Sequence, residues 1–449
     1  MRSLKLLLAD PKGQVFEHPW LLASLRSDES LLPPREHPIP LPEGAKLAHL
    51  PGRLPVGFDP DTMEPVLVRE FEVDGKRFVP HAVGATLPPG FTRTYLPGEV
   101  TTGKGPILPQ WAYTAAAWGD DGPVVWALHT DRRKHWTPAS FSTPEVKVLV
   151  KEHLARFPGN KVLKQLKTCA LVYRCFTSQN IFYARDEGGL PASVMCNAAC
   201  IGCISEQPED GPPSSHERME DGPSAQDLAD VAIWHLEHAP GRTMVSFGQG
   251  CEGEPLTRWK FIAEAIRLVR AKTQRGSINI NTNGSLTKGL DALYDAGLDA
   301  VRVSLNSAVS DLYAAYYKPS RYSWDDVEAS IALSRKRGAY VALNLLLFPG
   351  VTDRAGEAEA LVKLVKKYKI DQIQTRPLAI DPLQYIEVAK DRGAGGEPIG
   401  VANLIRLFKK EAPWVTVGNF ARGMGERRKV SSEDNAERDL QRLQRGPLH

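Results

Sequence analysis

The period of apolar and polar positions differs from one part of the chain to the next. Residues 1–140 hold short, largely apolar runs, such as 65–71 and 77–83, which are separated by turn dipeptides like Asp74-Gly75. Runs of this length between turn residues are typical of strands. Two further apolar runs flank the segment 119–122, Gly-Asp-Asp-Gly, which predicts a β-hairpin. The pattern therefore predicts a β-rich N-terminal domain over residues 1–140.

A helical period begins after this region. Thr143-Pro144-Glu145 is a typical helix start, because proline is favoured in the first turn. The apolar residues that follow keep helical spacing as far as Phe157-Pro158-Gly159, where proline and glycine end the pattern. We expect a helical connector over residues 141–190.

Beyond residue 190 the strand period and the amphipathic-helix period alternate. Ser224 and Asp227 have capping-box spacing, and apolar residues between Ile262 and Val269 recur at i, i+3, i+4 and i+7. The strand candidates are Ala192–Met195, Thr243–Phe247, Ser277–Asn281, Ala300–Leu305, Tyr340–Phe348 and Asp371–Thr375. Such alternation predicts parallel strands joined by right-handed crossovers.

The number of repeats favours an incomplete barrel. A closed eight-stranded barrel takes about 250 residues, whereas the shorter stretch here has six clear strand–helix repeats and its last helix ends near Glu411. We therefore expect an α/β fold whose core is a partial (β/α)6 barrel over residues 191–380, followed by a C-terminal helical extension over 381–449. Ligands of such sheets bind at the carboxyl ends of the strands.

Charge and the chain's apolar runs narrow the range of partners. Lysine and arginine number 56 against 53 aspartate and glutamate residues, so the whole-chain charge gives no reason to expect a nucleic-acid partner, and we expect none. From Gly425 onward the two signs are mixed, which favours a solvated helix over an RNA-binding arm. The apolar run Leu6–Ala9 is too short for a secretion signal, and no segment reaches membrane-spanning length. These features predict a cytoplasmic protein with no membrane partner.

Three of the six cysteines fall in the nine-residue segment MCNAACIGC, at Cys196, Cys200 and Cys203. Clustered cysteines in a reducing compartment bind metal or do redox chemistry more often than they form disulfides. Three thiolates on one loop after a strand can ligate three irons of a [4Fe-4S] cluster and leave the fourth iron open to a ligand. A Cys3His zinc site completed by His216 is the alternative.

The spacing Cys-x3-Cys-x2-Cys after the first strand candidate resembles the signature of the radical S-adenosylmethionine (radical SAM) superfamily. Other motifs follow in the order seen in that family. SFGQGCEGEPL, with Gly253-Glu254-Pro255, resembles its glycine-glutamate-proline motif, and NTNGS and VRVSLNS close the third and fourth strand candidates. The resemblance covers residues 190 to about 380. Gly202 departs from the pattern, because the family commonly has an aromatic residue there.

The resemblance implies a set of site residues and two cofactors. Cys196, Cys200 and Cys203 would bind a [4Fe-4S] cluster that binds S-adenosylmethionine at its open iron. The residues expected to contact S-adenosylmethionine are Glu252, Gly253, Glu254, Asn283, Ser304 and Asn306. Reductive cleavage of this cosubstrate would give a 5'-deoxyadenosyl radical that abstracts hydrogen from a peptide or small molecule. The resemblance also implies oxygen sensitivity and an electron donor such as flavodoxin or ferredoxin.

Several functional alternatives stay open at this point. The superfamily also contains activating enzymes and RNA-modifying enzymes, and a non-catalytic metal-binding or electron-transfer protein would need only the metal. The sequence identifies no catalytic residue for the second substrate. The remaining cysteines, Cys169, Cys175 and Cys251, are either ligands of a second metal site or buried thiols.

Overall fold

The structure is a computed structural model of the 449-residue chain. It describes residues 4–35, 38–101, 103, 105–133, 135–209, 211–249 and 251–423. The expected solvated helix beyond Gly425 lies outside these residues. In the described part of the chain, no helix is both long and apolar enough to cross a membrane.

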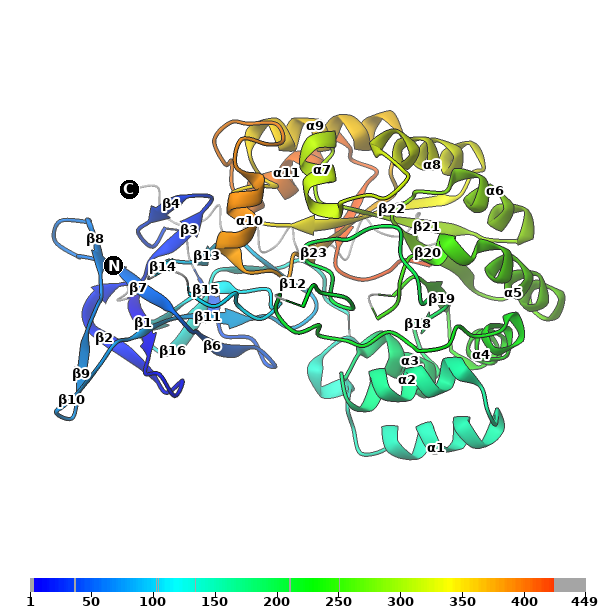
Figure 1. Ribbon diagram of the computed structural model, residues 1–449, viewed down its shortest axis with the longest axis horizontal. Coiled ribbons are helices and arrows are strands. Elements are labelled where there is room, and N and C mark those ends of the chain that lie inside the picture. Colours follow the sequence, from blue (N-terminus) through cyan, green and yellow to red (C-terminus); the bar gives the residue numbers. More distant parts are fainter. Residues whose placement is uncertain are drawn as a thin grey trace.

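The N-terminal region is built from antiparallel strands, and most of them join one large sheet (Figure 1). The strands are β1 (Lys5–Ala9), β2 (Val15–Leu22), β3 (Leu25–Ser27), β4 (Ser30–Leu32), β5 (Ile39–Pro40), β6 (Lys46–Leu50), β7 (Arg53–Phe58), β8 (Pro65–Leu67), β9 (Phe71–Val73), β10 (Lys76–Phe78), β11 (His81–Thr86), β12 (Phe91–Arg93), β13 (Leu96–Pro97), β14 (Glu99–Thr101), β15 (Thr114–Gly119), β16 (Gly122–Val125) and β17 (Ala127–His129). The predicted hairpin is confirmed, because β15 pairs with β16 around the Gly119–Gly122 turn.

Three helices follow, and the first lies where the helical spacing after Thr143 predicts a helix. They are α1 (Val146–Arg156), α2 (Lys161–Leu171) and α3 (Phe176–Tyr183), preceded by a 3-10 turn, η1 (Pro138–Ser140). Asn160 caps α2, since its side-chain oxygen accepts a hydrogen bond from the amide of Leu163 at 3.0 Å. Helix α3 packs against the first strand of the next sheet.

The C-terminal half is a curled, fully parallel sheet with helices on its outer side (Figure 1). Among the described residues its strands lie in sequence order: β18 (Glu187–Leu190), β19 (Met244–Phe247), β20 (Ser277–Thr282), β21 (Ala300–Leu305), β22 (Tyr340–Leu347), β23 (Gln372–Pro377) and β24 (Thr416–Gly418). The helical elements are α4 (Ala225–His238), η2 (Pro255–Arg258), α5 (Trp259–Lys272), α6 (Thr287–Ala296), α7 (Ser310–Tyr317), α8 (Trp324–Lys336), α9 (Ala355–Lys367), α10 (Pro382–Ala389) and α11 (Val401–Glu411). This arrangement is the expected partial barrel, and β24 adds a strand that the sequence did not reveal.

The first strand of the parallel sheet lies five residues before the predicted one. The sequence suggested Ala192–Met195, whereas β18 is Glu187–Leu190 and contains two glycines, which have low strand propensity. A Cβ on Gly188 would lie 2.3 Å from Ile181 Cδ1 of α3, so glycine lets the helix and strand pack closely with Ile181 in this position. The glycines that permit this close packing therefore explain why strand propensity did not predict β18.

The helices bury the apolar stripes that the sequence predicts. The capping box is confirmed at α4, where Ser224 Oγ accepts from the amide of Asp227 and the Asp227 carboxylate accepts from the amide of Ser224. Ile262, Ile266 and Val269 of α5 are fully buried against the sheet. This packing forms one continuous core around the barrel.

The N-terminal sheet docks on the barrel near the carboxyl end of β23. Thr92 Oγ1 of β12 lies 2.9 Å from Thr375 Oγ1, and the Arg93 guanidinium donates to the carbonyl of Leu378 at 2.7 Å. Arg53 forms a buried ion pair with Asp381, just before α10. Because these contacts are polar and buried, they fix the orientation of the two parts.

Candidate functional site

A cavity of about 480 Å³ opens at the carboxyl ends of the parallel strands. It lies between the loop 196–203, called the cysteine loop from here on, and the inner wall of the barrel. The site residues expected from the sequence that line it are Cys196, Cys200, Cys203, Glu252, Gly253, Glu254, Asn283 and Ser304. Asn306 was also expected at the site, but it does not line the cavity. The structure thus gathers motifs from four separate stretches of chain around one space.

Glu252 ties the cysteine loop to the loop after β19. One carboxylate oxygen accepts hydrogen bonds from the amides of Ala192 and Ser193, at 2.7 and 2.8 Å. The other accepts from Gly248 and Gln249, at 2.7 and 3.0 Å. Burial raises the pKa of Glu252 to about 8, while these four amide donors act in the opposite direction. The Glu252 side chain is therefore fully engaged in holding two loops together.

Gly253 brings the same loop into backbone contact with the segment directly before the cysteine loop. Its amide donates to the carbonyl of Ser193 at 2.9 Å, and the next amide, of Glu254, donates to the carbonyl of Met195 at 2.8 Å. A Cβ on Gly253 would lie 1.9 Å from the Met195 oxygen, which no side chain can satisfy. Glycine is thus required here for the approach of one backbone segment to another.

Glu254 and Asn283 join the β19 and β20 loops. The Glu254 carboxylate accepts from the hydroxyl of Thr282 and, at 2.8 Å, from the amide of Asn283. The Asn283 amide group in turn donates to Asn197 Oδ1 of the cysteine loop at 2.9 Å. Burial raises the pKa of Glu254 to about 7. Both side chains line the cavity while serving as supports for its loops.

Asn306 lies behind the cavity wall. Its side-chain amide donates to the carbonyl of Leu312 at 3.2 Å and to the hydroxyl of Tyr385 at 3.1 Å. These bonds connect β21 with α7 and α10. Asn306 is almost completely buried, so the structure places it in the support of the site and away from the cavity surface.

The end of α7 holds the other side of the cysteine loop. The amides of Ala199 and Ile201 donate to the carbonyls of Tyr317 and Tyr316, both at 3.1 Å. A Cβ on Gly202 would lie 2.8 Å from the hydroxyl oxygen of Tyr316. Tyr316 also lines the cavity. Its ring, from α7, therefore lies beside Gly202, the position at which the family commonly has an aromatic side chain.

The three thiols of the cysteine loop all line the cavity. Burial raises the pKa of the Cys196 and Cys200 thiols, so ligand formation at neutral pH would release protons. The Arg218 guanidinium donates a hydrogen bond to Cys203 Sγ at 3.8 Å. Within the described ranges, no three His, Cys, Asp or Glu side chains converge as one metal ion requires. A cubane cluster takes its thiolates on separate irons.

The remaining cysteines lie together beside the site. Cys251 forms a thiol hydrogen bond with Cys169, which together with burial raises the Cys251 pKa well above its ordinary value. The Cys175 amide donates to the carbonyl of Cys169 at 2.9 Å. Cys169 and Cys251 are both buried.

Sequence reasoning missed a set of polar side chains on the inner wall of the barrel. Those that line the cavity are Asn281, Arg302, Asn344 and Arg376. Parallel strands that are covered on both faces normally consist of almost continuous apolar residues. The sequence does contain a pattern that indicates a polar inner wall. Polar residues recur at every second position, as at Asn279 and Asn281 or at Gln374 and Arg376.

Comparisons with known proteins agree with this geometry. Residues 190–373 match the family described as the radical SAM superfamily. The chain is 29% identical to a GTP 3',8-cyclase of Streptomyces coelicolor over 202 residues, which are 44% of this chain and 55% of that protein. It is 28% identical to the GTP 3',8-cyclase of Thermodesulfovibrio yellowstonii over 203 residues, 45% of this chain and 58% of that protein. The chain thus spans about half the length of the relatives it matches.

Solved structures of the superfamily resemble the fold more distantly. A radical SAM methyltransferase from Sphaerobacter thermophilus is 15% identical, with a TM-score of 0.33 over 69% of this chain and 76% of that chain. Streptococcus suis SuiB bound to S-adenosylmethionine is 14% identical, with a TM-score of 0.36 over 55% of this chain and 51% of that chain. On the family match, residues 190–373 are a radical SAM domain, and enzymes of this class bind a [4Fe-4S] cluster and S-adenosylmethionine.

Proposed function

We propose that this chain is a radical SAM enzyme whose active site is the cavity beneath the cysteine loop. One observation carries the proposal: Cys196, Cys200 and Cys203 line the same cavity as polar side chains at the ends of the barrel strands. Three cysteines are one ligand short of a closed [4Fe-4S] site. An incomplete ligand set beside a cavity favours a metal-bound cosubstrate over simple electron transfer.

The chain's own residues would position the reacting groups and keep water from them. When bound, the cluster supplies the electron that cleaves the sulfonium of S-adenosylmethionine. Glu252 and Gly253 fix the start of the cysteine loop, and the carbonyls of Tyr316 and Tyr317 fix its middle. The ring of Tyr316 and the side chain of Leu378 lie beside Gly202 and exclude solvent from that wall.

The second substrate in this proposal is a small molecule or a short peptide. All lining residues lie between Thr177 and Ala379, so the cavity is formed by the barrel, its own loops and the start of α3. The relatives act, by their name, on GTP, which makes GTP the first compound to test. The proposal also includes a cytoplasmic setting, oxygen sensitivity, and flavodoxin or ferredoxin as the electron donor.

Anaerobic cleavage of S-adenosylmethionine tests the proposed function. The protein is reconstituted with iron and sulfide and reduced with dithionite, and the formation of 5'-deoxyadenosine is then measured. We expect turnover by the wild-type protein and none by Cys200→Ala. Cys169→Ala is the matched control, because this buried cysteine does not line the cavity, and we expect it to keep the activity.

The alternatives give different results in the same assay. No cleavage despite an intact cluster would contradict the proposal and favour an electron-transfer protein. Cleavage that persists in Cys200→Ala would show that the cysteine loop is not the cluster site.

A further inference from the structure

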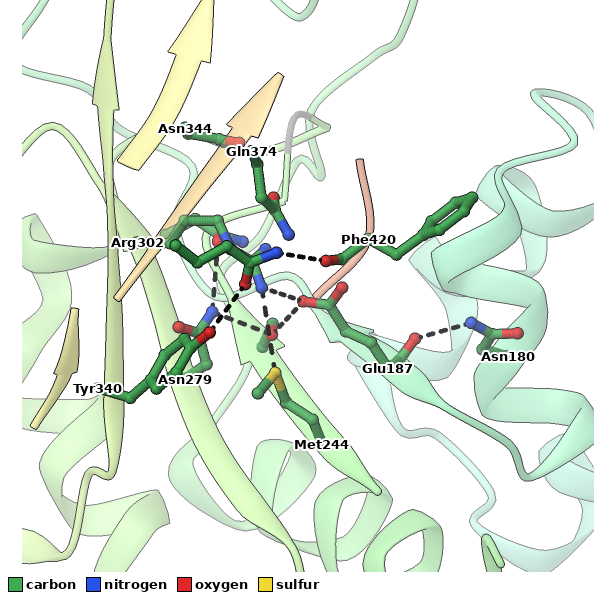
Figure 2. Close-up of polar contacts among 12 residues, drawn as sticks. Asn180, Glu187, Met244, Asn279, Arg302, Tyr340, Asn344, Gln374 and Phe420 are labelled. Atoms are coloured by element: carbon green, nitrogen blue, oxygen red, sulfur yellow. Dashed lines mark hydrogen bonds and ion pairs between the residues drawn. The ribbon is translucent and has the colours of Figure 1, made fainter. Parts of the chain in front are cut away.

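Two arginines on the inner wall of the barrel face the same cavity as the cysteine loop. Arg302 lies on β21 and Arg376 on β23, with β22 between them. Figure 2 shows Arg302 among Asn279, Asn344 and Gln374 in the interior of the barrel. A guanidinium on an inner wall is costly to desolvate unless an anion compensates it. The partners of each arginine therefore indicate what the wall can bind.

Arg302 has its counter-ion within the protein. Its Nη2 lies 3.0 Å from the Glu187 carboxylate, and Ser246 Oγ donates to the same oxygen at 2.5 Å. Burial raises the pKa of Glu187, but Arg302, Ser246 and the more distant charge of Arg376 outweigh burial and hold that pKa below its ordinary value. Glu187 is thus ionised and neutralises Arg302.

Arg376 has no such counter-ion. Its Nε donates to Asn344 Oδ1 at 3.3 Å and its Nη2 to Gln374 Oε1 at 3.2 Å, so both partners are neutral amides. Among the described residues, no carboxylate lies within ion-pair distance of it. The carboxylates that act on Arg376 from a greater distance are Glu187, which pairs with Arg302, and Asp131, which pairs with Arg422 at 3.1 Å. Burial lowers the pKa of Arg376 to about 10, which leaves the side chain charged at neutral pH.

The free end of Arg376 is accessible from the cavity. Its Nη1 has no hydrogen-bond partner among the described residues. This atom is also not among the fully buried, unpartnered polar atoms, so part of its surface is exposed. Asn344 and Gln374 hold the rest of the group, so the orientation of the guanidinium is fixed before any ligand arrives. A held guanidinium with free N–H groups is well suited to a carboxylate or phosphate, which it can bind through two parallel hydrogen bonds.

We infer that Arg376, oriented by Asn344 and Gln374, binds an oxyanion of the second substrate, which is therefore a small molecule with a carboxylate or phosphate group. The expected contacts of S-adenosylmethionine lie on β21 and the loops after β19 and β20, whereas Arg376 lies on β23. The inference rests on the proposed function only in naming the ligand a substrate. Oxyanion binding itself needs no radical chemistry.

Calorimetric titration of the reconstituted protein tests this inference. The probes are tripolyphosphate and succinate, each added with and without saturating S-adenosylmethionine. We expect one probe or both to bind in the presence of S-adenosylmethionine, and Arg376→Gln to weaken that binding at least about tenfold. The probe that binds better identifies the class of anion. Arg337→Gln, which removes an arginine from an exposed ion pair with Asp291, is the matched control and should bind as the wild type does.

A second variant guards against loss of folding in Arg376→Gln. Asn344→Asp keeps the arginine and places a carboxylate against its Nε, so it should weaken binding of the same probe by a similar factor. Three outcomes would overturn the inference: no binding of either probe by the wild type, equal binding by wild type and both variants, or displacement of the probe by S-adenosylmethionine. The last would assign Arg376 to the cosubstrate, and none of the three depends on whether S-adenosylmethionine is cleaved.

Discussion

Single residues in this site act mainly by shaping the path of the chain. Gly253 is the sharpest case, because the position of its missing Cβ lies 1.9 Å from a backbone oxygen of Met195, directly before Cys196. Backbone atoms cannot rotate away as a flexible side chain can. A methyl group at position 253 must therefore move the cysteine loop itself.

We predict that Gly253→Ala lowers stability by at least about 2 kcal/mol and reduces the iron bound after reconstitution. Chemical denaturation and iron analysis measure the two effects. Gly395→Ala is the matched control, since nothing lies within 4 Å of its Cβ position. Equal iron content in the two variants would show that the contact between Gly253 and Met195 does not set the cysteine loop.

Glu99 gives a pH prediction at the same scale. It is fully buried, neither carboxylate oxygen has a hydrogen-bond partner, and Arg53 Nε is 3.9 Å away. Burial, outweighing Arg53 and Arg26, raises the pKa of Glu99 from its ordinary 4.5 to about 7. Between these two pKa values the folded state keeps a proton on Glu99 that the unfolded state has released. The free energy of unfolding therefore falls as pH rises from 4.5 to about 7.

The expected loss from Glu99 between pH 4.5 and pH 8 is about 3 kcal/mol. Urea denaturation at pH 5 and pH 8 measures it, and Glu99→Gln should be less sensitive to pH by most of that amount. Glu72→Gln, at an exposed ion pair with Arg77, should keep the wild-type dependence. If Glu99→Gln also keeps it, Glu99 does not titrate in this range.

The sequence predicted where the site residues lie, but it did not predict which groups their side chains contact. The motifs located the cavity, yet Glu252 and Glu254, expected to contact S-adenosylmethionine, have their carboxylates engaged by backbone amides and a hydroxyl. Asn306 supports the wall from behind. Spacing along the chain gives the loop on which a side chain lies, but its hydrogen-bond partners come from distant segments. Contact of any of these residues with a cofactor stays a prediction.

At the scale of elements, the position of the N-terminal sheet depends on a few buried polar contacts. Asp381 is the most connected of them. It pairs with Arg53 of β7, accepts from the amide of Leu108 at 2.9 Å, and caps α10 by accepting from the amide of Leu383 at 3.1 Å. One side chain thus joins the sheet, a loop and a barrel helix.

We predict that Asp381→Ala lowers the free energy of unfolding by at least about 3 kcal/mol, because it leaves the buried Arg53 with only the weaker contact to Glu99 at 3.9 Å. Loss of the helix cap adds about 1 kcal/mol. Denaturant unfolding measures the change. Asp291→Ala, which breaks an exposed pair with Arg337, should cost no more than about 1 kcal/mol. Similar costs for the two variants would rule out a docking role for Asp381.

Elements with a strong period were predictable, and those chosen by packing were not. Strand β21 was expected at Ala300–Leu305 and lies there, because its alternation is unbroken. Strand β18 was displaced in the prediction, since Gly188 is required by its contact with Ile181. Strand β24 has only three residues, Thr416–Gly418, which is too short for any period to show.

At the scale of the whole molecule, the curled sheet brings the cysteine loop and the polar inner wall to one cavity. The loop is held by the segments after β19 and β20 and by the end of α7, and Gln110 of the N-terminal region donates to the carbonyl of Cys203 at 3.0 Å. Supports from so many separate segments require the complete fold. The division of the chain into four domains stays a prediction, and residues from more than one of these domains contribute to the site.

Electron paramagnetic resonance of the reduced protein, with and without S-adenosylmethionine, tests the central claim most directly. A cluster held by Cys196, Cys200 and Cys203 alone has an iron that the cosubstrate can ligate. We predict a [4Fe-4S] signal that changes when S-adenosylmethionine is added and that is absent from Cys200→Ala. A signal that S-adenosylmethionine leaves unchanged would contradict the account, because it would show that no iron is open to the cosubstrate.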